Sequence, residues 1–84
     1  MEAAVAIQEF VEYVVLKLIE HPEDASVLHQ QNGDQHEFHI RLNQSDIGRV
    51  IGRNGHTIGA IRNLVAAAAE RNGLHVAVEV DEAE

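Results

Sequence analysis

The most informative segment of the chain is Ser45-Asp46-Ile47-Gly48-Arg49-Val50-Ile51-Gly52-Arg53-Asn54-Gly55-His56-Thr57-Ile58-Gly59-Ala60-Ile61-Arg62. It predicts two helices joined by a tight glycine loop, Gly52-Arg53-Asn54-Gly55. A bare Gly-x-x-Gly occurs by chance in many proteins, so the residues around the loop carry the argument. Val50 and Ile51 precede it, Ile58 follows its second glycine by three positions, and a long helical pattern continues beyond. The segment therefore predicts a helix–loop–helix unit.

The glycine loop has the properties of an anion-binding site. A side chain in place of Gly52 or Gly55 would hold a phosphate away from the backbone N–H groups, and glycine also permits left-handed dihedral angles. The loop leads into the N-terminus of the second helix, where unpaired N–H groups and the helix dipole favour negative charge. Arg53 adds a mobile cation at the rim. The alternative is a plain helix–turn–helix in which glycine only caps a helix.

The pattern Val50-Ile51-Gly52-x-x-Gly55-x-x-Ile58 resembles the nucleic-acid-binding signature of KH domains. In KH modules such a loop clamps about four nucleotides of RNA backbone. The resemblance implies that the chain binds single-stranded RNA at the loop and the helical turns beside it. The implied RNA-binding residues are Gly48, Arg49, Ile51, Gly52, Arg53, Asn54, Gly55 and His56.

Base stacking on aromatic side chains is not expected, because the chain holds only Phe10, Tyr13 and Phe38, and both phenylalanines occupy predicted core positions. Bases would instead lie against an aliphatic groove. Gly48 is the best groove candidate, since its missing side chain opens space. Candidates for the groove floor, with ordinary core packing as the alternative, are Ile47, Val50 and Ile51.

The charge distribution favours nucleic acid at the motif and disfavours it elsewhere. The formal net charge is −8, yet between Ile47 and Arg71 four arginines stand against one glutamate. The remainder holds two cations against thirteen acids. Few phosphates can be neutralised, so weak binding with a shallow salt dependence is expected.

Length and composition predict one domain over residues 1–84, with a core of about residues 3–80 and an acidic tail at residues 81–84. A hydrophobic share of 45% is ordinary for a globular chain, and the lack of cysteine excludes disulfides and thiolate zinc sites. Neither a signal peptide nor a membrane-spanning run is recognisable. A soluble, cytoplasmic protein without a membrane partner is expected.

The first half of the chain predicts a helix and a β-hairpin. Residues 3–20 show helical spacing, and Pro22 is expected to end that helix. Residues 24–31 are a weaker strand candidate, Asn32-Gly33 predicts a two-residue hairpin turn, and residues 37–42 alternate as a half-buried strand. The apolar residues of the helix are Ile7, Phe10, Val11, Val14, Leu18 and Ile19.

The second half predicts the two motif helices and a last strand. Ser45 is placed to cap the first helix, and the second runs from about Thr57 to Arg71 with Asn72-Gly73 as a left-handed C-cap. Residues 74–80 alternate as a strand. The predicted class is α+β in the order α-β-β-α-α-β, which matches the type II KH fold. That resemblance implies a three-stranded mixed sheet with three helices on one face, and the Phe38 strand in the centre.

Catalysis and metal binding find little support. No Ser-His-Asp or paired-acid arrangement emerges, so we expect no enzyme and no cofactor. The six histidines lack ligand spacing, and solvated surface positions are the expected interpretation. His56 follows the loop directly and is a candidate phosphate neighbour, with an ordinary first-turn residue as the alternative.

The run Ser45-Asp46-Ile47-Gly48-Arg49-Val50-Ile51-Gly52-Arg53-Asn54-Gly55, together with a first helix that ends in His21-Pro22-Glu23, resembles the bacterial KhpA family. The resemblance covers about Val5 to Val80. It implies an RNA-binding protein proposed to act as an RNA chaperone with a KhpB (Jag/EloR)-type partner. It also implies a connection with cell elongation and envelope synthesis.

The rival hypothesis is a KH-fold interaction module with little RNA binding of its own. On that hypothesis the second motif helix forms a homodimer interface. Leu64 and Ala68 would contact the sheet and leave a partly free face at Ile58, Ile61 and Val65.

Overall fold

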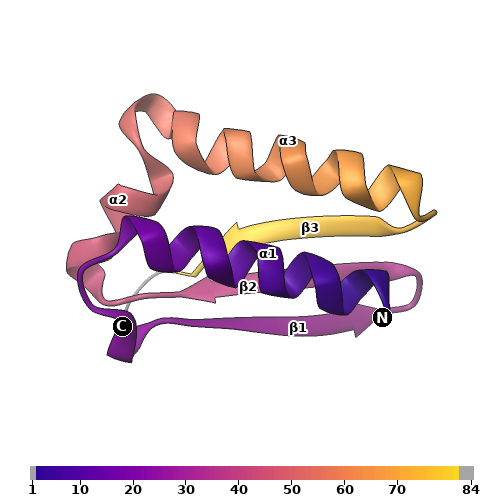
Figure 1. The fold of residues 1–84 in the computed structure, drawn as a ribbon, viewed down its shortest axis with the longest axis horizontal. Helices are drawn as coiled ribbons and strands as arrows, with labels where there is room; N and C mark the ends of the chain where they lie inside the picture. Colours follow the sequence, from indigo (N-terminus) through magenta and orange to yellow (C-terminus); the bar gives the residue numbers. More distant parts are fainter. Residues whose placement is uncertain (1, 82–84) are drawn as a thin grey trace.

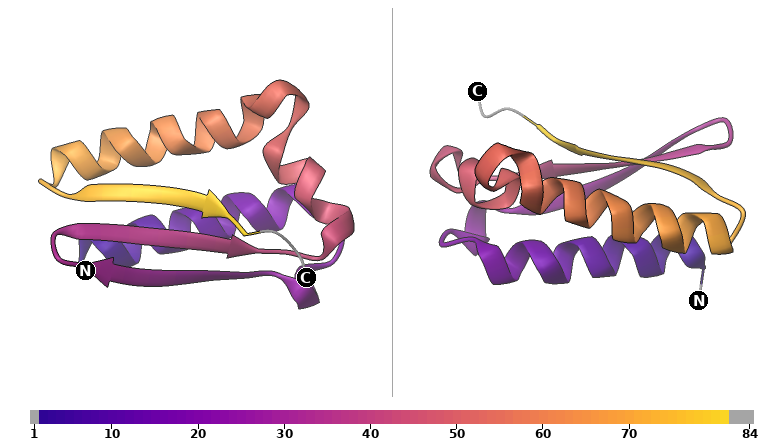
Figure 2. Two further views of the ribbon diagram at one scale, coloured as in Figure 1. Left: turned by 180° about the vertical axis from the view of Figure 1, so that it is seen from behind. Right: turned by 90° about the horizontal axis from the view of Figure 1, so that it is seen from above.

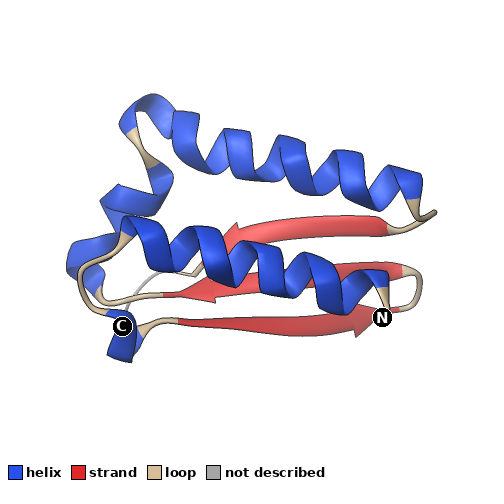
Figure 3. Ribbon diagram, in the orientation of Figure 1, coloured by secondary structure: helices blue, strands red, loops and turns tan. Residues whose placement is uncertain are grey.

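The computed structural model describes residues 2–81, in which three α-helices and three strands follow one another in the predicted order (Figure 1; Figure 3). None of the helices within residues 2–81 combines the length and the hydropathy that a membrane-spanning segment requires. The regular elements are α1 (Ala3–Leu18), β1 (Ser26–Asn32), β2 (Gln35–Arg41), α2 (Ile47–Ile51), α3 (His56–Arg71) and β3 (His75–Val80). Short 3-10 turns occupy Pro22–Asp24, Gln44–Asp46 and Arg53–Gly55.

The strands form one mixed sheet in the order β1-β2-β3. The central strand β2 runs antiparallel to β1, with Phe38 opposite His29, and parallel to β3, with Phe38 opposite Val78. Figure 2 shows α1 and α3 on one face of the sheet and α2 toward its end, while no helix of the described residues covers the other face. This confirms the predicted α+β class, the central position of the Phe38 strand, and the helices on one face.

The β1–β2 hairpin turns one residue later than predicted. Asn32 pairs with Gln35, so the two loop residues are Gly33 and Asp34 rather than Asn32 and Gly33. Gly33 takes a φ of 60°, which glycine adopts without a Cβ clash. The pairing register therefore places the glycine at the first loop position, not the second.

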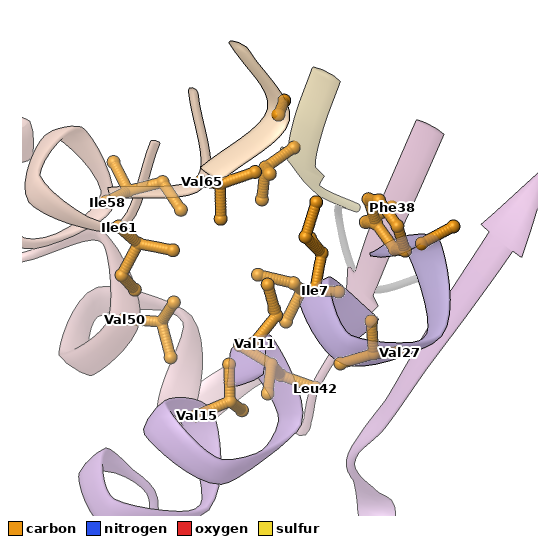
Figure 4. Close-up of a cluster of buried hydrophobic side chains, with 14 residues drawn as sticks. Ile7, Val11, Val15, Val27, Phe38, Leu42, Val50, Ile58, Ile61 and Val65 are labelled. Atoms are coloured by element: carbon orange, nitrogen blue, oxygen red, sulfur yellow. The ribbon is translucent and has the colours of Figure 1, made fainter. Parts of the chain in front are cut away.

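The core lies between the sheet and the helices (Figure 4). Phe38 in β2 is fully buried, and it shares this core with a buried row of α1 that includes Ile7 and Val11. The predicted core position of Phe10 is wrong, because its side chain is 37% exposed. Phe10 precedes Val11 and so lies about 100° around the helix from the buried row.

Each outer strand receives a side-chain hydrogen bond from the helix that covers it. Gln8 Nε2 in α1 donates to the carbonyl of Val27 in β1 at 2.9 Å, and Arg62 Nε in α3 donates to the carbonyl of Val78 in β3 at 2.9 Å. Edge strands offer unpaired backbone groups to other chains. The two bonds satisfy one carbonyl on each edge strand, and the Arg62 guanidinium is thereby used within the fold.

The helix α1 ends at Leu18, two residues before the predicted end at Glu20. Beyond it, the N–H groups of Glu20 and His21 donate to the two carboxylate oxygens of Asp46, at 3.0 and 2.9 Å. These two N–H groups do not continue the hydrogen-bond ladder of α1, because they bind a side chain of the 3-10 turn that precedes α2. Contact with Asp46, rather than Pro22 alone, accounts for the helix end.

Asp46 is the buried charged residue of the described chain, with 0% of its surface exposed. Burial by itself favours the neutral carboxyl, but the hydrogen bonds from Glu20 and His21 outweigh it and hold the pKa of Asp46 below its usual range.

Ser45, predicted as the helix cap, plays a different part. Its N–H and hydroxyl both donate to the side-chain oxygen of Asn43 at 2.9 Å.

Replacement of Asp46 by asparagine should destabilise the fold. The amide supplies one acceptor instead of two and turns an NH₂ group toward a backbone N–H, so one buried donor loses its partner. We expect Asp46→Asn to lower the free energy of unfolding by about 1–3 kcal/mol, measured by urea denaturation. The control Asp34→Asn lies in the exposed hairpin loop and should change it by less than about 0.5 kcal/mol. Equal stability of the two variants would contradict this role of Asp46.

A charged network lies on the sheet and ties the end of β3 to β2. His39 Nδ1 is 3.0 Å from Asp81 Oδ1, and its Nε2 is 3.2 Å from Glu37 Oε1. Arg41 Nε donates to the other Asp81 oxygen at 3.3 Å. Hydrogen bonds to Asp81 and Glu37 raise the pKa of His39. The pKa of Glu37 is lowered by its hydrogen bond with Asn32 and, to a smaller extent, by that with His39. The pKa of Asp81 is lowered by its hydrogen bonds with His39 and Arg41.

Asp81 is therefore not the start of a frayed tail, as predicted. Its N–H donates to the carbonyl of Ile40 at 2.9 Å, and its carboxylate contacts two side chains of β2. The rest of the predicted acidic tail, residues 82–84, lies outside the described residues.

The network should give stability its own pH dependence. Because the pKa of His39 is raised from 6.5, its contribution is complete below about pH 6.5 and is lost as the pH rises through the folded value. The lowered pKa values of Asp81 and Glu37 place their contributions above about pH 4.5, with loss in acid. We expect His39→Gln to flatten the fall in unfolding free energy between about pH 6 and 9. The exposed His75, changed to Gln, is the control, and an unaltered pH slope in His39→Gln would contradict the expectation.

Candidate nucleic-acid interface

The glycine loop connects α2 to α3 at one end of the molecule (Figure 1). Gly52 leaves α2 with φ 78° and ψ 171°, and Asn54 and Gly55 follow with φ values of 56° and 76°. The N–H of Gly52 donates to Gly48 O at 2.9 Å, and that of Gly55 donates to Gly52 O at 3.1 Å. Among residues 2–81, the N–H groups of Arg53 and Asn54 have no acceptor. Two adjacent backbone donors are thus left for a partner outside the chain.

The two loop glycines are required for different reasons. A Cβ on Gly52 would collide with Thr57, whose backbone nitrogen would lie 2.8 Å away, and the dihedral angles of Gly52 fall in a region that only glycine adopts. A Cβ on Gly55 would meet no atom within 4 Å, so its left-handed φ is the constraint there. The expectation that both glycines serve phosphate access missed the packing of Thr57 against Gly52.

The residues between the glycines are exposed. Arg53 forms no ion pair within the described part of the chain, so its guanidinium is open to an external anion. Asn54 is a residue type that tolerates a left-handed φ better than most, and that preference is the signal from which its conformation could have been predicted. His56 begins α3 as an exposed residue.

Arg49, the second predicted cation, is already paired. Its Nη2 donates to Glu20 Oε1 at 2.6 Å, and its Nε lies 3.6 Å from Asp46 Oδ1. Glu20 belongs to the segment after α1, 29 residues away. No local spacing in the sequence relates the two, and Glu20 was not among the predicted site residues.

The predicted groove floor is divided between core and surface. Val50 is a core residue with 0% exposure, so the core alternative holds for it. Ile47 and Ile51 are half-buried and pack at the margin of the core. Gly48 is exposed, and a Cβ there would meet no atom of the chain within 4 Å. The surface before the loop is thus open at Gly48 and aliphatic beside it.

A family model described as "KhpA/KhpB, KH domain" matches residues 8–80, which include the whole loop and all three strands. The chain belongs to the KhpA/KhpB KH-domain family. This confirms the resemblance on which the type II KH fold was expected.

Several bacterial proteins named RNA-binding protein KhpA are similar to this family member. That of Chlamydia pneumoniae is 33% identical over 75 residues, covering 89% of this chain and 96% of the relative. That of Bacillus subtilis (strain 168) is 30% identical over 74 residues, covering 88% and 91%. That of Streptococcus pneumoniae serotype 4 is 41% identical over 59 residues, covering 70% and 75%. No solved structure gives a significant match.

The helix face predicted for self-association of this KhpA/KhpB-family chain is buried. Ile58, Ile61 and Val65 are only 3%, 3% and 2% exposed, whereas Leu64, expected to contact the sheet, is 58% exposed. The prediction is wrong because α3 turns the Ile58 row toward the sheet. On the outside, α1 and α3 form a groove of about 470 Å³ whose lining includes Phe10 and Leu64.

The histidines are only partly the solvated residues that were predicted. His56 and His75 are exposed, but His29, His36 and His39 are half-buried and hydrogen-bonded. The ring nitrogens of His29 and His36 lie 2.8 Å apart across the hairpin. Among residues 2–81 no group of three or more His, Asp or Glu side chains is placed to hold a metal ion.

The two glycines should differ in their sensitivity to substitution. In Gly52→Ala the new Cβ would clash with Thr57, and alanine would have to adopt a backbone conformation that only glycine tolerates, so we expect a loss of about 2 kcal/mol or more in unfolding free energy. In Gly55→Ala the new Cβ has open space, and only the left-handed φ is unfavourable, so the unfolding free energy should fall by about 1–2 kcal/mol. Urea denaturation of the two variants checks the order, and a greater loss at Gly55 would contradict this account of the loop.

Proposed function

We propose that the chain binds single-stranded RNA through Gly52-Arg53-Asn54-Gly55. The observation that carries the proposal is the pair of N–H groups on Arg53 and Asn54, which find no acceptor among residues 2–81 and lie beside an exposed guanidinium. Membership of the KhpA/KhpB family supports it, as do the names of the relatives.

The chemistry of the proposed site is backbone recognition. Phosphate oxygens accept hydrogen bonds from the Arg53 and Asn54 N–H groups, and the Arg53 guanidinium and the N-terminus of α3 favour the negative charge. Bases lie over the open surface at Gly48 and the half-buried Ile51. A single short groove without an aromatic platform holds only a few nucleotides, prefers unpaired strands and distinguishes sequences weakly.

The proposed biological role rests on family membership. We propose an RNA chaperone or post-transcriptional regulator that works in the cytoplasm with a KhpB (Jag/EloR)-type KH partner. Through that partner it would be connected with cell elongation and envelope homeostasis. The support is the family match over residues 8–80.

A second candidate function is a KH-fold interaction module. One observation favours it: the groove between α1 and α3, where Phe10 and Leu64 are exposed. A homodimer or a KhpB-type partner would cover that groove. Sedimentation and RNA binding on one sample separate the two functions, since assembly without RNA affinity would favour the interaction module.

Acidic residues in the loop should abolish RNA binding. Arg53→Asp with Asn54→Asp places two anions where phosphate must approach and keeps both glycines, so the fold should persist. We expect at least about a tenfold loss of affinity for a single-stranded RNA oligonucleotide, measured by fluorescence anisotropy, with unchanged circular dichroism.

The chain offers a matched control in Arg71-Asn72, the same dipeptide at the opposite end of α3. Arg71→Asp with Asn72→Asp makes the same change in charge and should retain most of the affinity. Equal binding by the loop variant and the parent would refute the site. Duplex RNA that competes as well as a single strand of equal length would refute the preference for unpaired RNA.

A further inference from the structure

The pairing of Glu20 with Arg49 occupies a cation next to the glycine loop. The 2.6 Å bond between Glu20 Oε1 and Arg49 Nη2 is the shortest side-chain hydrogen bond among the described residues. Arg49 lies on α2 three residues before Gly52, about one helical turn from the loop. The side chain of Glu20 remains 63% exposed and that of Arg49 49% exposed. An incoming anion can therefore reach the guanidinium that Glu20 now holds.

Glu20 is placed there by the fold. Its backbone N–H donates to the buried Asp46 carboxylate at 3.0 Å, and Arg49 Nε lies 3.6 Å from the same carboxylate. Most exposed ion pairs lose side-chain entropy when two long side chains are brought together. Here one buried group positions both partners, so the Glu20 carboxylate is held close to Arg49 before any ligand arrives.

We infer that Glu20 is an intramolecular competitor of RNA phosphate for Arg49, an inference that rests on the proposed function. Carboxylate and phosphodiester oxygens both bind guanidinium through charge-assisted hydrogen bonds. In the free chain the Glu20 carboxylate cancels the positive charge of Arg49 near the path of the RNA. This leaves Arg53 as the loop cation without an anionic partner in the described chain. Glu20 thereby limits the affinity of the site.

Competition has a signature in the salt dependence of binding. When phosphate takes Arg49 from Glu20, the phosphate releases part of its counterion, and the freed carboxylate is again screened by cations from solution. The contact with Arg49 therefore adds less to the net counterion release than a contact with an unpaired arginine would. With a neutral residue in place of Glu20, the same contact adds a release of about 0.7 ion for a single strand. Affinity and salt dependence should therefore change together.

The test compares Glu20→Gln with Glu23→Gln in the full chain. Both remove one exposed carboxylate, and the first keeps the backbone bond between residue 20 and Asp46, while Glu23 lies beside His21 rather than Arg49. The probe is a fluorescein-labelled oligouridylate of about ten nucleotides, titrated at several salt concentrations. We expect Glu20→Gln to bind about 2- to 5-fold tighter than Glu23→Gln at low salt. Its slope of log K against log salt should be steeper by up to about 0.7.

A second pair of variants assigns the gain to Arg49. In an Arg49→Gln background, Glu20→Gln should bind no better than Glu23→Gln, because the contested guanidinium is gone. The same gain in both backgrounds would overturn the inference, as would equal affinities of Glu20→Gln and Glu23→Gln. Either of these two results refutes only the role of Glu20 if the parent binds RNA and the Arg53→Asp, Asn54→Asp variant does not. If neither the parent nor Glu20→Gln binds the probe, the proposed function fails as well.

Discussion

The buried carboxylate of Asp46 is the contact on which the placement of the glycine loop depends. It is shielded from solvent and accepts hydrogen bonds from the backbone N–H groups of Glu20 and His21, which follow the end of α1. A buried carboxylate is costly unless hydrogen bonds replace its water. The two backbone donors do so and keep its pKa low. Because Asp46 directly precedes α2, this group joins the end of one helix to the start of the next and positions the loop that follows.

The positive charge available around the loop depends on which arginines are paired within the fold, not on how many arginines there are. Four arginines lie between residues 47 and 71, yet Arg49 is bound to Glu20 and Arg62 to the carbonyl of Val78. One serves the junction of α1 and α2, and the other serves the edge of the sheet. Arg53, between the glycines, has no ion pair in the described chain. A count of basic residues therefore overstates the positive charge that this surface offers to RNA.

Several expectations failed where a helix had more than one plausible buried face. Apolar residues on α1 and α3 cover more than half of each circumference, so periodicity left the buried row ambiguous. Phe10 and Val11 were both predicted on one apolar face, but the structure buries Val11 and leaves Phe10 37% exposed. In α3 the structure buries Ile58 rather than Leu64. The predicted position of the hairpin turn was also wrong. Asn32-Gly33 is a favourable turn sequence, but the pairing register of β1 against β2 places the loop one residue later.

The sequence by itself determined the order of elements, the class of fold and the form of the loop. These follow from local causes: hydrophobic period, the C-cap at Gly73, and the left-handed angles that glycine and asparagine permit at Asn54 and Gly55. Only the tertiary structure decided that Asp46 captures the end of α1 and that Glu20 holds Arg49. Those contacts join residues more than twenty positions apart, and a buried charge finds its partners only when packing removes it from water.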